Sequence, residues 1–150
     1  MPATLHYTAL EGIPTVTAGT DLAALVLTAA RQSGITWRDG DILVLAQKIV
    51  SKAEGRAIPL SGVQPRPEAE KLARDSEKDP RVVELILQES TEVLRCRPGA
   101  IIVQHRLGFV LANAGIDASN VEAVDGDETV LLLPADPDGS AAALRAKIRQ

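Results

Sequence analysis

The sequence predicts an α+β fold with mixed, mainly antiparallel sheets and packed helices. Two helix-start signals, in which a proline opens an apolar pattern, stand at Pro67 and at Asp79-Pro80. Three short strand-like segments then follow one another directly between residues 93 and 112, as in an antiparallel meander. Because strands and helices do not alternate strictly, we favour α+β over a doubly wound parallel sheet. The 150 residues suit one domain or two subdomains, about 1–90 and 91–150.

The first expected elements are a strand and a helix. Residues 5–10 read as a short strand, which the turn at Gly12 and Pro14 ends. Thr20 is a plausible N-cap for a helix over residues 21–32, whose apolar residues fall on one stripe. Gly34 supplies the stop at its C-terminal end.

The middle of the chain is expected to place a central strand before two helices. Residues 42–46 form an unbroken apolar run, which predicts a strand buried on both faces. Residues 57–60 are expected to be extended. A helix then runs from Pro67 to about Ser76, and another begins at Pro80 with Asp79 as its N-cap.

The last third is expected to be a meander followed by a strand and a helix. The strands cover residues 93–95, 100–104 and 109–112, and residues 106–108 turn the last two into a hairpin. A polar loop at 113–120, an acidic turn at 125–128 and a buried strand at 129–133 follow. Ser140 can cap a final helix whose cations Arg145, Lys147 and Arg149 suit a helix C-terminus.

Composition and charge exclude several classes. The net charge of −4 argues against a nucleic-acid-binding protein, which needs a basic face. No apolar run approaches the roughly 18 residues that span a bilayer. The single cysteine, Cys96, cannot form an internal disulfide; two flanking arginines could lower its pKa, but we expect a structural role. Without a charged-then-apolar leader, the expected compartment is the cytoplasm.

Residues 47–56, QKIVSKAEGR, carry the main candidate for an anion site. They follow the apolar run at 42–46, and Lys48, Lys52 and Arg56 could balance phosphate charge while Gly12 permits a phosphate-binding turn. No P-loop or Rossmann glycine pattern is present. A solvated loop explains the same residues, and Ser51 with Glu54 fits a capping box.

Asp117 is the main metal-ligand candidate. Its neighbours Asn113, Ser119 and Asn120 carry oxygen atoms, and together they could hold Mg²⁺ or Mn²⁺. An Asx-turn at the hairpin exit also explains Asp117, and the local sequence favours that explanation. For Asp136 and Asp138 turn and capping roles are favoured, and the isolated His6 and His105 lack the spacing of a zinc site.

Five segments in this order resemble the coenzyme F-420-0:L-glutamate ligase family, the gamma-glutamyl ligases of deazaflavin coenzyme biosynthesis. They are GIP at residues 12–14, DGDILVLAQKIVSKAEGR at 39–56, DPRVVELILQES at 79–90, ANAGIDASN at 112–120 and LLLPADPDGSA at 131–141. Each segment alone is a match of modest specificity, but the five segments in this order cover almost the whole chain and are specific together.

The resemblance implies a gamma-glutamyl-ligase-like fold and a GTP-dependent ligase that adds L-glutamate to the deazaflavin coenzyme F-420-0, using Mg²⁺ or Mn²⁺, with K⁺ as a further candidate. It implies a cytoplasmic homodimer acting on small molecules, without nucleic acid or membrane partners. No catalytic residue is assigned. The implied nucleotide contacts are Gly12, Ile13, Pro14, Thr15, Gln47, Lys48, Lys52 and Asn120, and the implied metal ligand is Asp117.

The resemblance covers the N-terminal portion of the family pattern. Family members continue into a block with an Asp-Thr pair that completes the metal site and a glycine-rich nucleotide-contacting segment. Three alternatives therefore stay open: a fragment of the ligase, a chain that pairs with a C-terminal partner chain, or a non-catalytic nucleotide-binding or assembly module. A metal-binding structural domain is least favoured.

Overall fold

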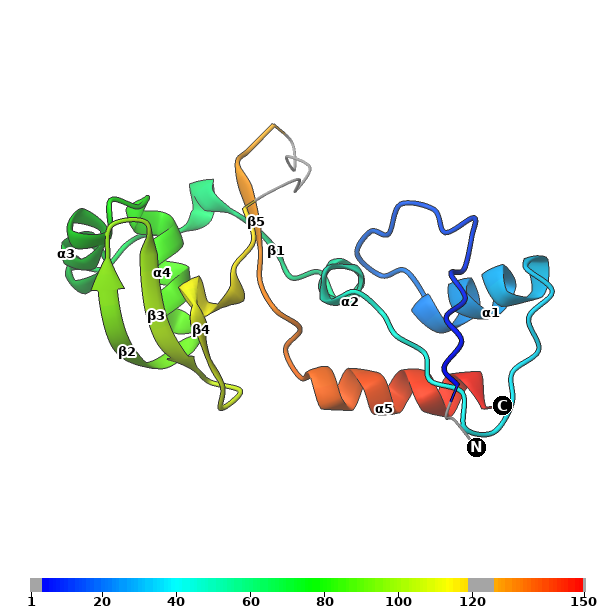
Figure 1. Cartoon of the computed structure of the whole chain (residues 1–150). Coiled ribbons are helices and arrows are strands. Elements are labelled where there is room, and N and C mark those ends of the chain that lie inside the picture. Colours follow the sequence, from blue (N-terminus) through cyan, green and yellow to red (C-terminus); the bar gives the residue numbers. More distant parts are fainter. Residues whose placement is uncertain (1–3, 119–125, 150) are drawn as a thin grey trace.

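The computed structural model describes residues 4–118 and 126–149. Its helices, strands and 3-10 turns confirm the α+β class (Figure 1). In chain order they are α1 (Leu22–Gln32), α2 (Gln47–Ala53), β1 (Ala57–Pro59), η1 (Leu60–Gly62), α3 (Pro67–Ser76), α4 (Pro80–Gln88), β2 (Ser90–Arg97), β3 (Ala100–His105), β4 (Val110–Ala112), η2 (Asn113–Gly115), β5 (Thr129–Leu131) and α5 (Pro137–Ile148).

One part of the molecule is an antiparallel sheet of β2, β3 and β4, with α3 and α4 packed beside it (Figure 1). Residues in β3 alternate in burial, and Ile101 and Val103 are fully buried against Val83 and Ile86 of α4. Because this period of two matches a strand with one covered face, the local pattern specified the meander. The predicted strands and their hairpin are confirmed.

A two-stranded ribbon connects this sheet to the rest of the chain. β1 pairs antiparallel with β5, with Ile58 opposite Val130. Leu60, Leu85, Val130 and Leu132 form a second buried cluster, to which the ribbon contributes Val130. Figure 1 shows the ribbon between the sheet and the part that contains α1, α2 and α5. The extended segment predicted near residue 57 and the buried strand predicted near residue 130 are therefore confirmed.

The helix caps differ from two predictions. Asp21, not Thr20, caps α1, because its Oδ1 accepts from the backbone N–H groups of Ala23 and Ala24 at 3.0 and 3.2 Å. Asp136, not Ser140, caps α5, and its Oδ1 accepts from Gly139 N at 2.9 Å. Asp21 lies one residue after its predicted cap and Asp136 lies four residues before its own, so the sequence located each helix start to within about a turn.

The start signals of α3 and α4 are confirmed. Pro67 and Pro80 each occupy a first-turn position where a backbone N–H is not needed. Asp79 caps α4 as predicted, with Oδ1 accepting from Arg81 N at 2.7 Å. A boundary between subdomains near residue 90 stays a prediction. No helix in the described part of the chain is long and apolar enough to cross a bilayer.

Two predicted strands do not form. Residues 5–10 and 42–46 are assigned to no strand, and the expected burial of 42–46 is wrong because Ile42 and Val44 are 82% and 80% exposed. Leu5 and Tyr7 are also exposed. A strand requires a paired neighbour, and within residues 4–118 and 126–149 none pairs with these segments. The apolar pattern of these segments therefore indicates a preference for strand structure that is not realised in the described fold.

Cys96 lies half-buried on β2. Burial raises the pKa of its thiol, and Asp75 adds to the same direction. The suggestion that flanking arginines lower this pKa is wrong, because desolvation disfavours the thiolate. This environment agrees with a structural role.

Candidate functional site

The motif at residues 47–56 folds as a helix with a defined end, so the solvated-loop interpretation is wrong. After α2, Gly55 takes a positive φ of 68° and its N–H donates to Lys52 O at 3.0 Å. The N–H of Arg56 donates to Ser51 O at 2.9 Å. These two bonds form a Schellman motif, which only a residue that tolerates a left-handed backbone supports without strain. The glycine of the motif therefore has a structural reason.

Lys48 and Asp117 meet at this helix. The Nζ of Lys48 lies 2.5 Å from Oδ2 of Asp117, and the two side chains are 35% and 27% exposed. Asp117 reaches this position because its backbone forms a β-bridge with Leu131, with N–H···O distances of 3.0 and 2.8 Å. The structure thus brings the predicted cationic and metal-binding residues together.

Gln47 and Lys52 belong to the same helix. The side-chain amide of Gln47 donates to Ser51 Oγ at 2.5 Å and lies 3.5 Å from Leu132 O, which orients it toward the chain after β5. Lys52 follows Lys48 by four residues, so the two lysines share one helix face. An anion above that face would meet the Lys52 ammonium and a Lys48 ammonium that is already paired with the carboxylate of Asp117.

Ser51 and Glu54 do not form the predicted capping box. Ser51 is buried inside α2, where it cannot act as an N-cap. Glu54 follows the helix, and its carboxylate accepts from Ala135 N at 3.2 Å and from the Ser140 hydroxyl. The carboxylate of Glu54 therefore holds the N-terminal end of α5 near α2, a long-range role that the local pattern did not indicate.

Residues 12–15 precede α1 in the chain and lie near α2. Gly12 takes the predicted positive φ, at 73°, and a Cβ at this position would lie 3.6 Å from Gln32 Oε1. Ile13 lines a cavity with Ile49 of α2. Further along, Gly19 N donates to Ala53 O at 2.9 Å. Gly19 therefore meets α2 at its C-terminal end, whereas Asp117 meets it at Lys48 near the other end.

The donor atoms around Asp117 limit which metal ion fits. Asn120 and Ser119 lie outside the described residues, and Asn113 Oδ1 accepts from Ile101 N at 3.0 Å. Residues 4–118 and 126–149 contain no group of three His, Cys, Asp or Glu side chains that could hold a metal ion. Mg²⁺ commonly uses one or two carboxylates and completes its shell with water and phosphate oxygens. The carboxylate of Asp117 fits an ion shared with a phosphate.

A buried ionic cluster behind α2 was not predicted. Glu89 accepts from Arg56 Nη2 at 2.9 Å and from Arg106 Nε at 3.1 Å. Arg56 also donates to Leu133 O at 2.8 Å, so its guanidinium is engaged in the fold and is a poor candidate for phosphate binding. His105 lies fully buried beside Glu89. No local spacing joins these residues, so only the tertiary structure reveals the cluster.

The protein is thus of the α+β class, and a lysine on α2 pairs with a carboxylate on a neighbouring bridge. Residues 12–150 match the family model described as F420-0:Gamma-glutamyl ligase, and the chain belongs to this family. This agrees with the resemblance drawn from the sequence segments.

Proteins named coenzyme F420:L-glutamate ligase are similar to this chain. The protein from Methanothermobacter thermautotrophicus is 51% identical over 132 residues, which cover 88% of this chain and 51% of that protein. The protein from Methanopyrus kandleri is 45% identical over 88% of this chain and 49% of its own length. The protein from Archaeoglobus fulgidus is 42% identical over 93% of this chain and 52% of its own length. The chain thus spans about half the length of these relatives.

Proposed function

We propose that this chain forms the nucleotide-facing and metal-facing part of a GTP-dependent ligase that joins L-glutamate to coenzyme F420-0. The observation that carries the proposal is the 51% identity to a protein named coenzyme F420:L-glutamate ligase over 88% of this chain. The Lys48–Asp117 pair supports it, because it places a cation and a hard oxygen donor at one site.

The proposed reaction proceeds through an acyl phosphate. A carboxylate oxygen of F420-0 attacks the γ-phosphorus of GTP, the bond to the β-phosphate oxygen breaks, and GDP leaves. The glutamate amine then attacks the acyl carbon, inorganic phosphate departs with the C–O bonding electrons, and the amine loses its proton as the amide forms. Such phosphoryl transfer depends mainly on positioning and on neutralising charge.

The side chains on α2 would supply that positioning. Lys48 and Lys52 balance the charge of the phosphate groups, while Gln47 and the turn at residues 12–15 contact the nucleotide. Asp117 would bind the divalent ion, and Asn120 would be a further nucleotide contact. When bound, Mg²⁺ or Mn²⁺ would neutralise charge on the transferring phosphoryl group; K⁺ is an additional candidate. Without nucleotide, Lys48 and Asp117 neutralise each other.

Calorimetric titration of the purified chain with GDP and Mn²⁺ tests the binding half of the proposal. We expect saturable binding that requires the metal, with GTP competing and ATP competing poorly. The catalytic half is tested by following formation of the glutamyl amide by mass spectrometry. This assay combines the chain, F420-0, L-glutamate, GTP and Mn²⁺ with the part of the Methanothermobacter relative that the chain does not match. Absence of both metal-dependent binding and ligation would refute the proposal.

A second candidate function is a non-catalytic nucleotide-binding or assembly module. The exposed apolar side chains Ile42 and Val44 favour it, because such surface usually marks an interaction site. Light scattering at increasing protein concentration, with and without GDP and Mn²⁺, separates the candidates. A stable dimer or hetero-complex that neither binds nucleotide nor supports ligation would favour the assembly role.

A further inference from the structure

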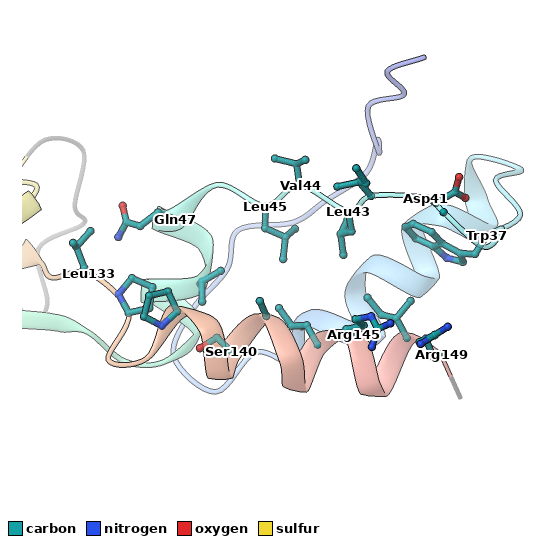
Figure 2. Close-up of a pocket in the computed structure, with 18 of the residues that line it drawn as sticks. Trp37, Asp41, Leu43, Val44, Leu45, Gln47, Leu133, Ser140, Arg145 and Arg149 are labelled. Carbon is teal, nitrogen blue, oxygen red and sulfur yellow. The ribbon is translucent and has the colours of Figure 1, made fainter. Parts of the chain in front are cut away.

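Residues 42–46 have the geometry of a strand without a neighbour. Leu43 and Leu45 are half-buried, whereas Ile42 and Val44 between them are 82% and 80% exposed, so side chains alternate between two sides. In Figure 2, Leu43 and Leu45 point toward α5 and Val44 points away from it. Across the described residues, the backbone of 42–45 makes no hydrogen bond. An extended apolar edge of this kind is a template for an added strand.

A groove runs between this segment and α5 (Figure 2). We call it the α5 groove; its volume is about 1120 Å³. Apolar side chains form its walls, and they include Trp37, Leu43, Leu45, Leu133, Leu144 and Ile148. Arg145 and Arg149 line it toward the C-terminal end of α5, and Asp39 and Asp41 line the same groove, with Arg149 4.0 Å from the carboxylate of Asp39. Its walls therefore combine an open strand edge and apolar side chains with charged groups of both signs.

We propose that the α5 groove docks an extended apolar segment that adds a β-strand to residues 42–46. Its backbone would pair with the open N–H and C=O groups of 42–45, and alternate apolar side chains would cover Ile42 and Val44 on one side and fill the groove on the other.

The segment is assigned to the half of the family's sequence that this chain does not match. The chain covers only 49–52% of the Methanothermobacter, Methanopyrus and Archaeoglobus relatives, so a comparable length of polypeptide accompanies this fold in each of them. The assignment rests on family membership and on the unpaired edge, and it does not depend on ligation activity.

Hydrogen exchange at residues 42–46 tests this docking directly. The probes are overlapping synthetic peptides of about ten residues, the length of a long strand, that span the unmatched part of the Methanothermobacter relative. The amides of 42–45 should exchange rapidly in the chain alone, because none of the described residues pairs with them. At least one peptide with alternating apolar residues should slow their exchange by about tenfold or more.

Matched variants separate docking at the groove from general stickiness. Ile42→Lys with Val44→Lys should abolish the protection, and Val44→Pro should do so by removing one backbone donor. All three changes fall on exposed side chains, so circular dichroism should be unchanged. The control is Leu94→Lys with Val110→Lys, at exposed apolar positions of β2 and β4, which should retain full protection.

Two results would overturn the proposal. The first is that no peptide protects residues 42–45, or that protection survives in the groove variants. The second is protection in the chain alone that grows with protein concentration, since that would show that a second copy occupies the edge.

Discussion

The ammonium group of Lys48 lies 2.5 Å from the carboxylate of Asp117, which joins the start of α2 to the bridge beside β5. Both side chains are partly exposed, and measured ion pairs of that kind contribute only about 0–1 kcal/mol to stability. Stabilising the fold alone is therefore a weak explanation for this pair. If the pair serves ligand binding instead, removing it should lower the affinity for the ligand more than the stability of the fold.

We predict that Lys48→Ala weakens binding of GDP with Mn²⁺ by at least about tenfold, since a charge-assisted hydrogen bond contributes roughly 1.5–3 kcal/mol. The free energy of unfolding should change by less than about 1 kcal/mol. Calorimetric titration and urea denaturation measure the two quantities. Lys71→Ala, at an exposed lysine of α3, is the control and should change neither. Equal binding by both variants would contradict the assignment of Lys48.

Glu84 gives a second prediction. Its side chain is 3% exposed and accepts from Arg66 N, Arg66 Nε and Gln88 Nε2 at 2.8–3.0 Å. Burial alone would raise the pKa of Glu84, but the Arg66 and Gln88 donors outweigh it and the pKa lies below its ordinary value of 4.5. Stability from this carboxylate is therefore fully present above about pH 4.5 and is lost as pH falls through the lower folded pKa.

Glu84→Gln should accordingly reduce the free energy of unfolding at pH 7 by about 2–3 kcal/mol, because buried donors lose a charged acceptor. It should also flatten the acid limb of the stability profile. Urea denaturation between pH 3 and pH 7 checks both effects. Glu68→Gln, at an exposed position in the first turn of α3, should match the parent chain. A steep acid limb in the Glu84 variant would show that other carboxylates control it.

Elements with local signals were predictable from sequence. Pro67 and Pro80 fixed the starts of two helices, and the period of two in residues 100–105 fixed a strand. Residues 42–46 carried an equally clear apolar signal, yet they form no strand, because a ladder needs a neighbour as well as a suitable sequence. Local patterns thus specify what a segment can do, and long-range pairing decides whether it does so.

The candidate site shows the same division. Lys48 and Asp117 were each identified from residue type and neighbours, but their contact depends on the bridge between Asp117 and Leu131, which no spacing reveals. The pairing of Arg56 with Glu89 gave no local signal at all. An arginine inside a cationic motif looked like a phosphate ligand, and only the fold shows that a buried carboxylate engages it.

Gly55 supplies a third prediction. Gly55→Ala places a Cβ on a backbone with a φ of 68°, which costs about 1–2 kcal/mol for an L-residue. The nearest atom to that Cβ would be Ala18 Cβ at 3.7 Å, an ordinary contact, so backbone strain alone explains the loss. Gly62→Ala is the control, because nothing lies within 4 Å of its Cβ and its φ is not positive. Thermal denaturation should separate the two variants, and equal melting temperatures would contradict the strained turn.

His105 provides the last prediction. It is fully buried, its Nδ1 accepts from Leu107 N at 3.0 Å, and its Nε2 lies 3.5 Å from Glu89 Oε2. Burial lowers the pKa of His105 below its ordinary 6.5; Arg106 and Arg56 act in the same direction, and the charge of Glu89 opposes them only in part. The His105 imidazole of the unfolded chain therefore binds a proton near pH 6.5, whereas that of the folded chain stays neutral at this pH. Stability is fully present above that pH and declines below it, by at most about 1.4 kcal/mol per pH unit.

His105→Gln keeps a hydrogen-bond acceptor but does not titrate, so it should remove this slope between pH 5 and pH 7 in urea denaturation. His6→Gln, at an exposed histidine, is the control and should retain the slope. Parallel pH profiles for the parent chain and the His105 variant would show that the buried imidazole does not set the slope.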